Sequence, residues 1–210
     1  MRLKNVKGAK EKIEASLYVV LEPMKYKGKY NEVFNNNNPI RIEIGMGKGQ
    51  FTIENAKRFP DINFIGIEKY DSVMVRAVEK LDELCLPNLK LIKADAEYID
   101  TFFDKEIDLI YLNFSDPWPK NRHENRRLTS RVFLEKYDKI FNTDPHIIMK
   151  TDNRQLFEFS IKSLTDYDYR IENLSLDLYD DDVSSNIQTE YEERFQSKGY
   201  NIYRIEVTKK

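Results

Sequence analysis

Cysteine and histidine are scarce in this chain of 210 residues, and their scarcity excludes two kinds of site. The single cysteine, Cys85, cannot form an internal disulfide and cannot build a cysteine cage around a metal. The only two histidines, His123 and His146, offer too few nitrogen ligands for a typical zinc site. We therefore predict that the protein uses no metal.

Long apolar runs are absent as well. A transmembrane helix needs about 20 consecutive apolar residues, and no run in the chain approaches that length. The N-terminal piece "SLYVVLEP" is short and follows mixed charges, unlike a signal peptide. The sequence thus predicts a cytoplasmic protein.

An excess of positive charge is also missing. The 34 Lys and Arg residues are balanced by 36 Asp and Glu residues, which gives a net charge of -2. This balance argues against a protein that coats nucleic acid by bulk charge, but it leaves room for a local basic site. With 40% hydrophobic residues, the chain is long enough for one globular domain with a sizeable core.

From residue 40 onward, strand-like and helix-like segments alternate. Short β-branched runs predict strands, and apolar residues three or four apart predict helices between them. The predicted strands cover residues 39–45, 62–70, 89–95, 107–114 and 146–151, and the predicted helices cover 50–59, 71–86, 128–141 and 154–164. This α/β alternation predicts a mostly parallel sheet with helices on both faces.

The C-terminal part has a different pattern. Residues 169–178 and 201–207 read as two further strands, with a short helix at 190–199 between them. We expect these strands to form an antiparallel pair at the edge of the sheet, which brings it to seven strands. No linker divides residues 36–210, so we predict one domain there.

A basic segment, residues 1–35, precedes this domain. We expect it to be either a mobile arm or the start of a helix, with help in RNA binding as its only assigned role. The stretch "NEVFNNNNP" at its end predicts a loop, because Asn and Pro favour turns.

The loop "EIGMGKGQF" follows the first predicted strand and opens the next helix. Gly45, Gly47 and Gly49 permit backbone conformations that other residues avoid, and they let a ligand touch the main chain. A plain strand-to-helix turn is the alternative. The spacing differs from the G-x-G-x-x-G of loops that bind a dinucleotide pyrophosphate. Glu43 would repel a pyrophosphate, but it suits the amino group and sulfonium of S-adenosylmethionine.

Two more acidic residues stand at predicted strand ends. Glu68 ends the second strand, where a carboxylate can accept hydrogen bonds from both ribose hydroxyls. Asp95 ends the third strand, where it can accept a hydrogen bond from an adenine amino group. Each acid alone is more often a solvated loop residue. With Glu43 they place acids at three consecutive strand ends, which face one crevice, and this favours S-adenosylmethionine over a nicotinamide cofactor.

The fourth predicted strand runs into "NFSDPWPKNRHENRR". Pro117 and Pro119 fix φ in this loop, and Pro117 also restricts Asp116 to extended conformations. A rigid aspartate beside Trp118 offers a seat for a flat aromatic ring; alternatively, Asp116 is a turn residue and Trp118 fills the core. The basic side chains from Lys120 onward suit the phosphates of RNA or DNA.

Taken together, these segments resemble the bacterial tRNA (guanine-N7-)-methyltransferase family. The resemblance covers roughly residues 40–206 and rests on "EIGMGKGQF", "GIEKY", "NFSDPWPKNRHENRR", "KTDN" and "TEYEERFQSKGYNIYR". It implies a Rossmann-like class I methyltransferase fold, with S-adenosylmethionine as the methyl donor and tRNA as the partner. The implied reaction is methyl transfer to N7 of a guanine in the tRNA variable loop, guanine 46 in tRNA numbering.

The resemblance also implies roles for single residues. Asp116 corresponds to the catalytic aspartate and to one of the cofactor contacts. The other cofactor contacts fall on Glu43, Glu68 and Asp95. The substrate contacts match Lys120, Asp152, Thr189, Glu190, Tyr191 and Glu192. The RNA-contacting run matches Arg122, His123, Arg126 and Arg127, and it departs from many members at Asn125, where they have an additional Lys.

Other interpretations remain open at this point. Asp152 also suits the N-cap of the following helix, and Thr189 with Glu192 has the spacing of a capping box. An Asp-Pro-aromatic sequence after the fourth strand also suits methylation of an exocyclic amino group. A non-catalytic RNA-binding module with a vestigial cofactor loop is a third interpretation, and the oligomeric state is open between monomer and homodimer.

Overall fold

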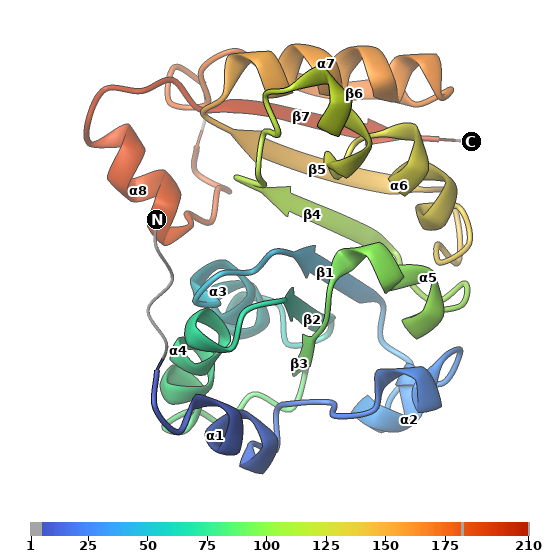
Figure 1. The fold of residues 1–210 in the computed structure, drawn as a ribbon, viewed down its shortest axis with the longest axis vertical. Coiled ribbons are helices and arrows are strands. Elements are labelled where there is room, and N and C mark those ends of the chain that lie inside the picture. Colours follow the sequence, from blue (N-terminus) through green and yellow to red (C-terminus); the bar gives the residue numbers. More distant parts are fainter. Residues whose placement is uncertain (1–5, 182, 210) are drawn as a thin grey trace.

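In the computed structural model, which describes residues 6–181 and 183–209, a seven-stranded sheet runs through the middle of the molecule (Figure 1). The strands are β1 (Ile40–Ile44), β2 (Asn63–Glu68), β3 (Leu89–Lys93), β4 (Leu109–Asn113), β5 (His146–Thr151), β6 (Arg170–Ser175) and β7 (Tyr203–Thr208). Their order in the sheet is β3-β2-β1-β4-β5-β7-β6. Strands β1 to β5 are parallel, and β7 is antiparallel to both β5 and β6. The predicted sheet is confirmed.

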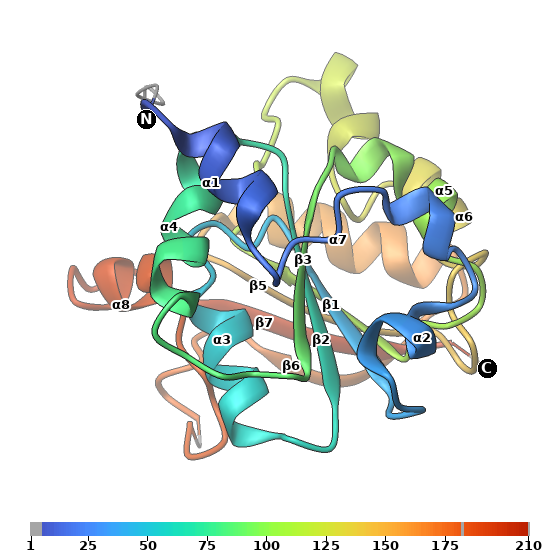
Figure 2. The ribbon, with the colours of Figure 1, turned by 90° about the horizontal axis from the view of Figure 1, so that it is seen from below.

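Helices cover both faces of this sheet, as Figures 1 and 2 show. They are α1 (Ala9–Ala15), α2 (Tyr30–Phe34), α3 (Gln50–Arg58), α4 (Asp71–Leu81), α5 (Ile99–Phe102), α6 (Arg131–Tyr137), α7 (Arg154–Asp166) and α8 (Glu190–Gln196), with short 3₁₀ helices η1 (Pro23–Tyr26), η2 (Ala96–Tyr98) and η3 (Asn121–Arg126). One hydrophobic cluster joins the sheet to α2, α5, α6 and α7, and the other joins it to α1, α3 and α4. A sheet covered on both faces explains why its central strands are almost continuously apolar.

Strand β2 shows how this packing positions the loop after β1. All its residues are buried, including Gly66. A Cβ at Gly66 would lie 2.3 Å from Sδ of Met46, which belongs to the glycine-rich loop. The missing side chain therefore lets the loop pack directly on β2, and this close approach fixes the loop at the end of the sheet.

The N-terminal segment differs from the loop that "NEVFNNNNP" predicted. Residues 30–34 form α2, so the prediction is wrong for "NEVF". Tyr30 and Phe34 are buried in the core, four residues apart on one helix face. Their burial outweighs the turn preference of the following asparagines, because tertiary packing supplies most of the stability of short helices. Residues 1–5 of the basic segment lie outside the described residues.

The N-terminal helix α1 packs along α4, as both ribbon views show (Figures 1 and 2). Lys12 forms an ion pair with Asp82, at 3.3 Å, and Ile13 is buried in the same cluster as α4. Within the described part of the chain, none of the helices has the length and apolar character needed to cross a membrane.

Candidate active site

The predicted site residues gather where the parallel strands end. Strand β1 lies between β2 and β4, so the connections after β1 and after β4 leave on opposite sides of the sheet. A sheet of this kind opens a crevice outside the carboxyl ends of those strands. Glu43 lies near the end of β1 and Glu68 ends β2, while Asp95 and Asp116 lie just after β3 and β4. The sequence therefore brings four acidic residues to one edge.

The glycine-rich loop adopts the conformation that its glycines were expected to permit. Gly45, Gly47 and Gly49 all have positive φ, of 79°, 59° and 77°. A Cβ at Gly49 would lie 2.8 Å from Cβ of Ala77, so the start of α3 meets α4 closely there. At Gly45 and Gly47, by contrast, an added Cβ would have no atom within 4 Å. The main chain at these two glycines is open to a ligand.

Glu43 lies beneath this loop and is 3% exposed. One of its carboxylate oxygens accepts a hydrogen bond from the Thr52 hydroxyl, and the other accepts one from Nδ2 of Asn113 at 2.9 Å. Burial raises the pKa of Glu43, although these hydrogen bonds and the charge of Lys150 act in the opposite direction. Both oxygens are thus already bonded within the protein.

Asn113, at the end of β4, is a site residue that the sequence analysis missed. Its Oδ1 is buried and lacks a hydrogen-bond partner among the described residues. A buried acceptor without a partner is unusual in a folded protein and calls for a donor from a ligand or water. A polar residue at the end of an apolar strand was the signal available in the sequence.

Glu68 joins the end of β2 to the glycine-rich loop. Its Oε1 accepts hydrogen bonds from the backbone N–H groups of Lys69 and Tyr70, at 2.9 and 3.0 Å, and its Oε2 accepts one from Gly47 at 3.1 Å. Burial raises the pKa of Glu68, and the nearby charge of Asp116 contributes in the same direction. Glu68 therefore ties the glycine-rich loop to the end of β2.

Asp95 is the most exposed of the three predicted acids of the cofactor site. Its Oδ2 pairs with Nζ of Lys69 at 2.5 Å, and its Oδ1 accepts a hydrogen bond from the backbone N–H of Glu97 at 3.0 Å. Burial raises the pKa of Asp95, but the hydrogen bond and charge of Lys69 outweigh it, so the pKa lies below its usual value. Lys69 is therefore a charged residue of this edge to which the sequence analysis assigned no role.

Asp116 is exposed and lies in a loop with unusual backbone angles. Phe114 and Trp118, on either side of it, have positive φ of 51° and 42°. Such values are rare for bulky side chains, and they cluster at functional sites. The backbone N–H of Phe114 donates to the carbonyl of Lys150 at 2.8 Å, which ties the start of the loop to β5.

The basic residues after this loop divide into two groups. Lys120, Arg122 and Arg126 are exposed, and Arg126 lies over the Trp118 ring with its Cζ 4.9 Å from the centroid. His123 is half-buried and meets the Trp118 ring edge to face at 5.8 Å. The remaining member, Arg127, turns back toward the Pro-Trp-Pro loop and contacts main-chain carbonyls there.

The segment predicted to contact substrate begins α8. The capping box is confirmed: Thr189 Oγ1 accepts from the N–H of Glu192 at 2.9 Å, and the Glu192 carboxylate accepts from the N–H of Thr189. Glu190 pairs with Lys48 of the glycine-rich loop at 2.8 Å and with Lys80 of α4 at 2.5 Å. Helix α8 is thus fastened to the cofactor side of the crevice.

Glu192 is fully buried, and its partner is a residue that the sequence analysis missed. Nζ of Lys150, on β5, lies 2.5 Å from Oε2 of Glu192 and donates to the carbonyl of Ile187 at 2.9 Å. Burial lowers the pKa of Lys150, and Glu192 opposes that shift. A lysine in an otherwise apolar strand was the available signal, since buried charges are almost always paired.

Asp152 and Tyr191 meet on the open side of the crevice. Asp152 is not the cap of α7, since Oδ1 of Asn153 accepts the capping bond from the N–H of Leu156 at 2.8 Å. The Asp152 carboxylate instead lies 3.5 Å from the hydroxyl of Tyr191. The Tyr191 ring is exposed and lies 4.9 Å from the ring of Phe114, two residues before the catalytic candidate.

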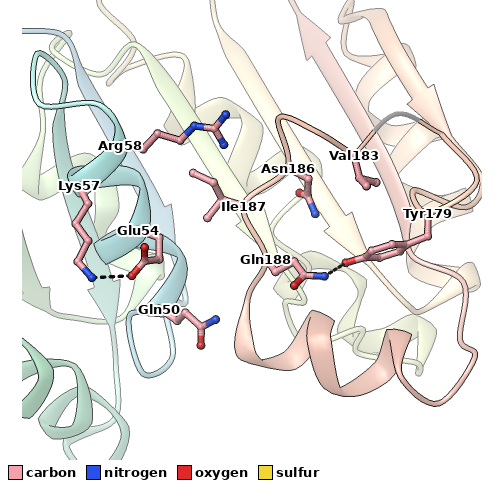
Figure 3. Close-up of a pocket in the computed structure, with 9 residues that line it drawn as sticks. All are labelled: Gln50, Glu54, Lys57, Arg58, Tyr179, Val183, Asn186, Ile187 and Gln188. Atoms are coloured by element: carbon pink, nitrogen blue, oxygen red, sulfur yellow. Dashed lines mark hydrogen bonds and ion pairs between the residues drawn. The ribbon is translucent and has the colours of Figure 1, made fainter.

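A cavity of about 500 Å³ lies between α3 and the described residues of the segment before α8 (Figure 3). It is lined by Gln50, Glu54, Lys57, Arg58, Tyr179, Val183, Asn186, Ile187 and Gln188. On the side of the cavity away from α3, Gln188 donates a hydrogen bond to the hydroxyl of Tyr179. Asn186 and Ile187 also accept hydrogen bonds from Lys150, the buried partner of Glu192. None of the predicted site residues lines the cavity. Among the described residues, no group of acidic, histidine and cysteine side chains is arranged to hold a metal.

The strand order and the acidic strand ends define a class I methyltransferase. The structure is similar to an antibiotic-related methyltransferase, with a TM-score of 0.67 at 17% identity over 85% of this chain and 92% of that one. It is also similar to a 16S rRNA methyltransferase, with a TM-score of 0.64 at 12% identity, covering 86% of this chain and 92% of that one. At such identities the likeness is one of fold.

Sequence comparisons identify the family. The model of a family described as "Putative methyltransferase" matches residues 37–205. The tRNA (guanine-N(7)-)-methyltransferase of Geobacillus sp. (strain WCH70) is 53% identical over 99% of this chain and 95% of its own length. The enzyme of the same name from Lachnoclostridium phytofermentans is 52% identical over 98% and 97%. The chain belongs to the tRNA (guanine-N(7)-)-methyltransferase family.

Proposed function

We propose that this chain transfers the methyl group of S-adenosylmethionine to N7 of a guanine in the tRNA variable loop, at position 46. The observation that carries the proposal is the exposed Asp116 carboxylate just after β4, at the edge of the sheet where Glu68 ends β2 and the glycine-rich loop is open. The high identity to enzymes named for this reaction supports the choice of substrate.

The residues at this edge fit S-adenosylmethionine. The orphaned Oδ1 of Asn113 is a buried acceptor that suits an amino group, and the open main chain at Gly45 and Gly47 leaves room for a ligand to approach. Glu68 accepts three backbone hydrogen bonds, which leaves its carboxylate one further lone-pair position for a ribose hydroxyl. When bound, the cofactor supplies a methyl group on a sulfonium.

The chemistry of guanine N7 explains why one carboxylate, that of Asp116, suffices for the methyl transfer. Guanine N7 has an in-plane lone pair and carries no proton at neutral pH, so the reaction needs no general base. The protein has to align N7 with the methyl group and stabilise the positive charge that develops on the purine. The Asp116 carboxylate supplies a negative charge at that position, and it also offers a hydrogen-bond acceptor to the guanine ring.

The tRNA side of the site is basic. Lys120, Arg122 and Arg126 are exposed in the run that follows Asp116 and suit backbone phosphates. Asp152 and Tyr191 also lie near the loop of Asp116, where the exposed part of Tyr191, whose ring stacks on Phe195, offers an aromatic edge and a hydroxyl to a base. We infer that residues 36–210 act as one methyltransferase domain in the cytoplasm, as a monomer or a homodimer.

A methylation assay tests the proposal. Purified protein is incubated with S-adenosylmethionine and an unmodified tRNA transcript, and the nucleosides are analysed by mass spectrometry. We expect N7-methylguanine from the wild-type transcript and none from a transcript in which guanine 46 is replaced by adenine. A product methylated on an exocyclic amino group, or no product from a protein that binds the cofactor by calorimetry, would contradict it.

A further inference from the structure

Arg127 directs its guanidinium into the protein. Its Nε donates a hydrogen bond to the carbonyl of Pro117, and its Nη2 donates one to the carbonyl of Trp118, both at 3.1 Å. Its Cζ lies 4.2 Å from the centroid of the Phe159 ring on α7. Arg122, in the same basic run, is exposed. The Arg127 guanidinium therefore contacts main-chain carbonyls of the protein, whereas Arg122 is open to solvent.

The loop after β4 depends on donors from outside. Pro117 and Pro119 have no N–H, so neither can donate a backbone hydrogen bond. Among the described residues, no backbone-to-backbone hydrogen bond joins two residues of the stretch 115–119. Arg127 supplies two parallel donors to successive carbonyls, and the planar fork of an arginine suits this geometry in a way that a lysine ammonium does not.

The chain next to Arg127 is held firmly. The carbonyl of Leu128 accepts a hydrogen bond from the hydroxyl of Tyr137 on α6 at 3.0 Å. The hydroxyl of Thr129 is hydrogen-bonded to that of Ser160 on α7 at 2.7 Å. Both residues adjoin helices packed in the core, so Arg127 reaches from a rigid support back to the loop.

We propose that Arg127 is a positioning residue that fixes the peptide units directly after Asp116, and with them the direction of the Asp116 carboxylate. Its role is therefore not that of a ligand for RNA phosphate. The catalytic consequence rests on the proposed function, whereas the effect on the loop does not. Because a misplacement of about 1 Å can cost about 100-fold in rate, a loosened loop should act on the transfer step.

The loop carries its own probe, because Trp118 is the single tryptophan of the chain. The first test compares the fluorescence anisotropy and acrylamide quenching of Trp118 in wild type, Arg127→Lys, Arg127→Ala and the control Arg122→Ala, with no substrate present. We expect lower anisotropy and stronger quenching in both Arg127 variants, and wild-type values in the control. Thermal melting of each variant verifies that it is folded.

The second test separates positioning from phosphate binding. Arg127→Lys keeps the charge, and we expect it to lower the single-turnover methyl-transfer rate at saturating tRNA by about 10- to 100-fold. The slope of log Kd for tRNA against log salt should stay at its wild-type value. Arg122→Ala should instead lower that slope by about 1, as loss of one phosphate contact does.

A second variant keeps the proposal testable if the Arg127 substitutions do not fold. Phe159→Leu removes the ring beneath the guanidinium but keeps an apolar side chain, and it should move the Trp118 signal and the transfer rate in the same direction by a smaller factor. Wild-type fluorescence and rate in Arg127→Lys, or a salt slope lowered by about 1 in Arg127→Ala without a rate loss, would overturn the proposal. If wild type forms no N7-methylguanine, the proposed function fails, while the fluorescence still decides the role of Arg127.

Discussion

The two halves of the crevice hold their charged residues in different ways. On the side of β1, β2 and β3, the carboxylates of Glu43, Glu68 and Asp95 each accept at least two hydrogen bonds from the protein. On the side of β4, Asp116 is exposed, and its loop is held by Arg127, which comes from ten residues further along the chain. The carboxylates of the cofactor half are therefore fixed by direct hydrogen bonds to the protein, whereas the loop that carries Asp116 is held through Arg127.

This difference predicts where substitutions act on rate. Asp116→Asn keeps the size of the side chain and removes the charge, so the transfer rate should fall by on the order of 10²–10³-fold. Because the residue is exposed, the melting temperature should stay unchanged. Single-turnover assays at saturating substrates measure the effect.

The matched change in the cofactor half is Asp95→Asn. It weakens a charged acceptor, so we expect it to act mainly on the Kd for S-adenosylmethionine, by roughly 10-fold. Calorimetry measures this constant. A full transfer rate in Asp116→Asn, or a larger rate loss in Asp95→Asn than in Asp116→Asn, would contradict this division of roles between the two halves of the crevice.

The buried ion pair beneath the substrate half should have the largest effect on stability. Glu192→Ala leaves the Lys150 ammonium buried without its partner, and the free energy of unfolding should fall by about 3–5 kcal/mol. Urea denaturation measures it. Glu193→Ala, at the exposed next position of α8, is the control and should stay within about 0.5 kcal/mol of wild type.

Gly47 and Gly49 in the cofactor half should differ in their effect on stability. Gly49→Ala adds a Cβ that would lie 2.8 Å from Cβ of Ala77, so the variant combines backbone strain at positive φ with overpacking. The free energy of unfolding should fall by about 1–3 kcal/mol. Gly47→Ala adds only the backbone strain, because no atom lies within 4 Å of its Cβ, so we expect the free energy of unfolding to fall by about 1 kcal/mol. Denaturation curves rank the two, and an equal loss would show that the contact with α4 is unimportant.

A pH dependence should come from outside both halves. Hydrogen bonds from His146 and Arg204, on β5 and β7, lower the pKa of Glu206 to about 2. An acid whose pKa is lower in the folded state stabilises the fold above its unfolded pKa, here 4.5, and this stabilisation is lost as the pH falls toward 2.

We therefore expect Glu206→Gln to lose less stability than wild type between pH 5 and 2. The group is partly exposed, and with solvent screening the difference should be about 1–2 kcal/mol. Denaturation at several pH values measures it. Parallel pH profiles for the two proteins would rule out Glu206 as the cause.

Much of this organisation could be predicted from local patterns. The β-branched runs and the glycine-rich loop identified the parallel strands, and the acids at their ends identified the crevice, because these signals lie within a few residues. The pairing of Lys150 with Glu192 spans 42 residues, and no local pattern reports which buried charges meet. For the same reason, Arg127 read as one more member of a basic run, although its guanidinium turns inward.

The position of β7 has a consequence for how the chain is made. It is the last strand along the described part of the chain, yet it lies inside the sheet, between β5 and β6. Until residues 203–208 have left the ribosome, β6 has no neighbouring strand and the edge of β5 stays open. A chain that stops before residue 203 would carry the glycine-rich loop and the loop of Asp116, but also an unpaired sheet edge, which other chains can join. Strand β7 therefore protects this protein against aggregation as well as completing its sheet.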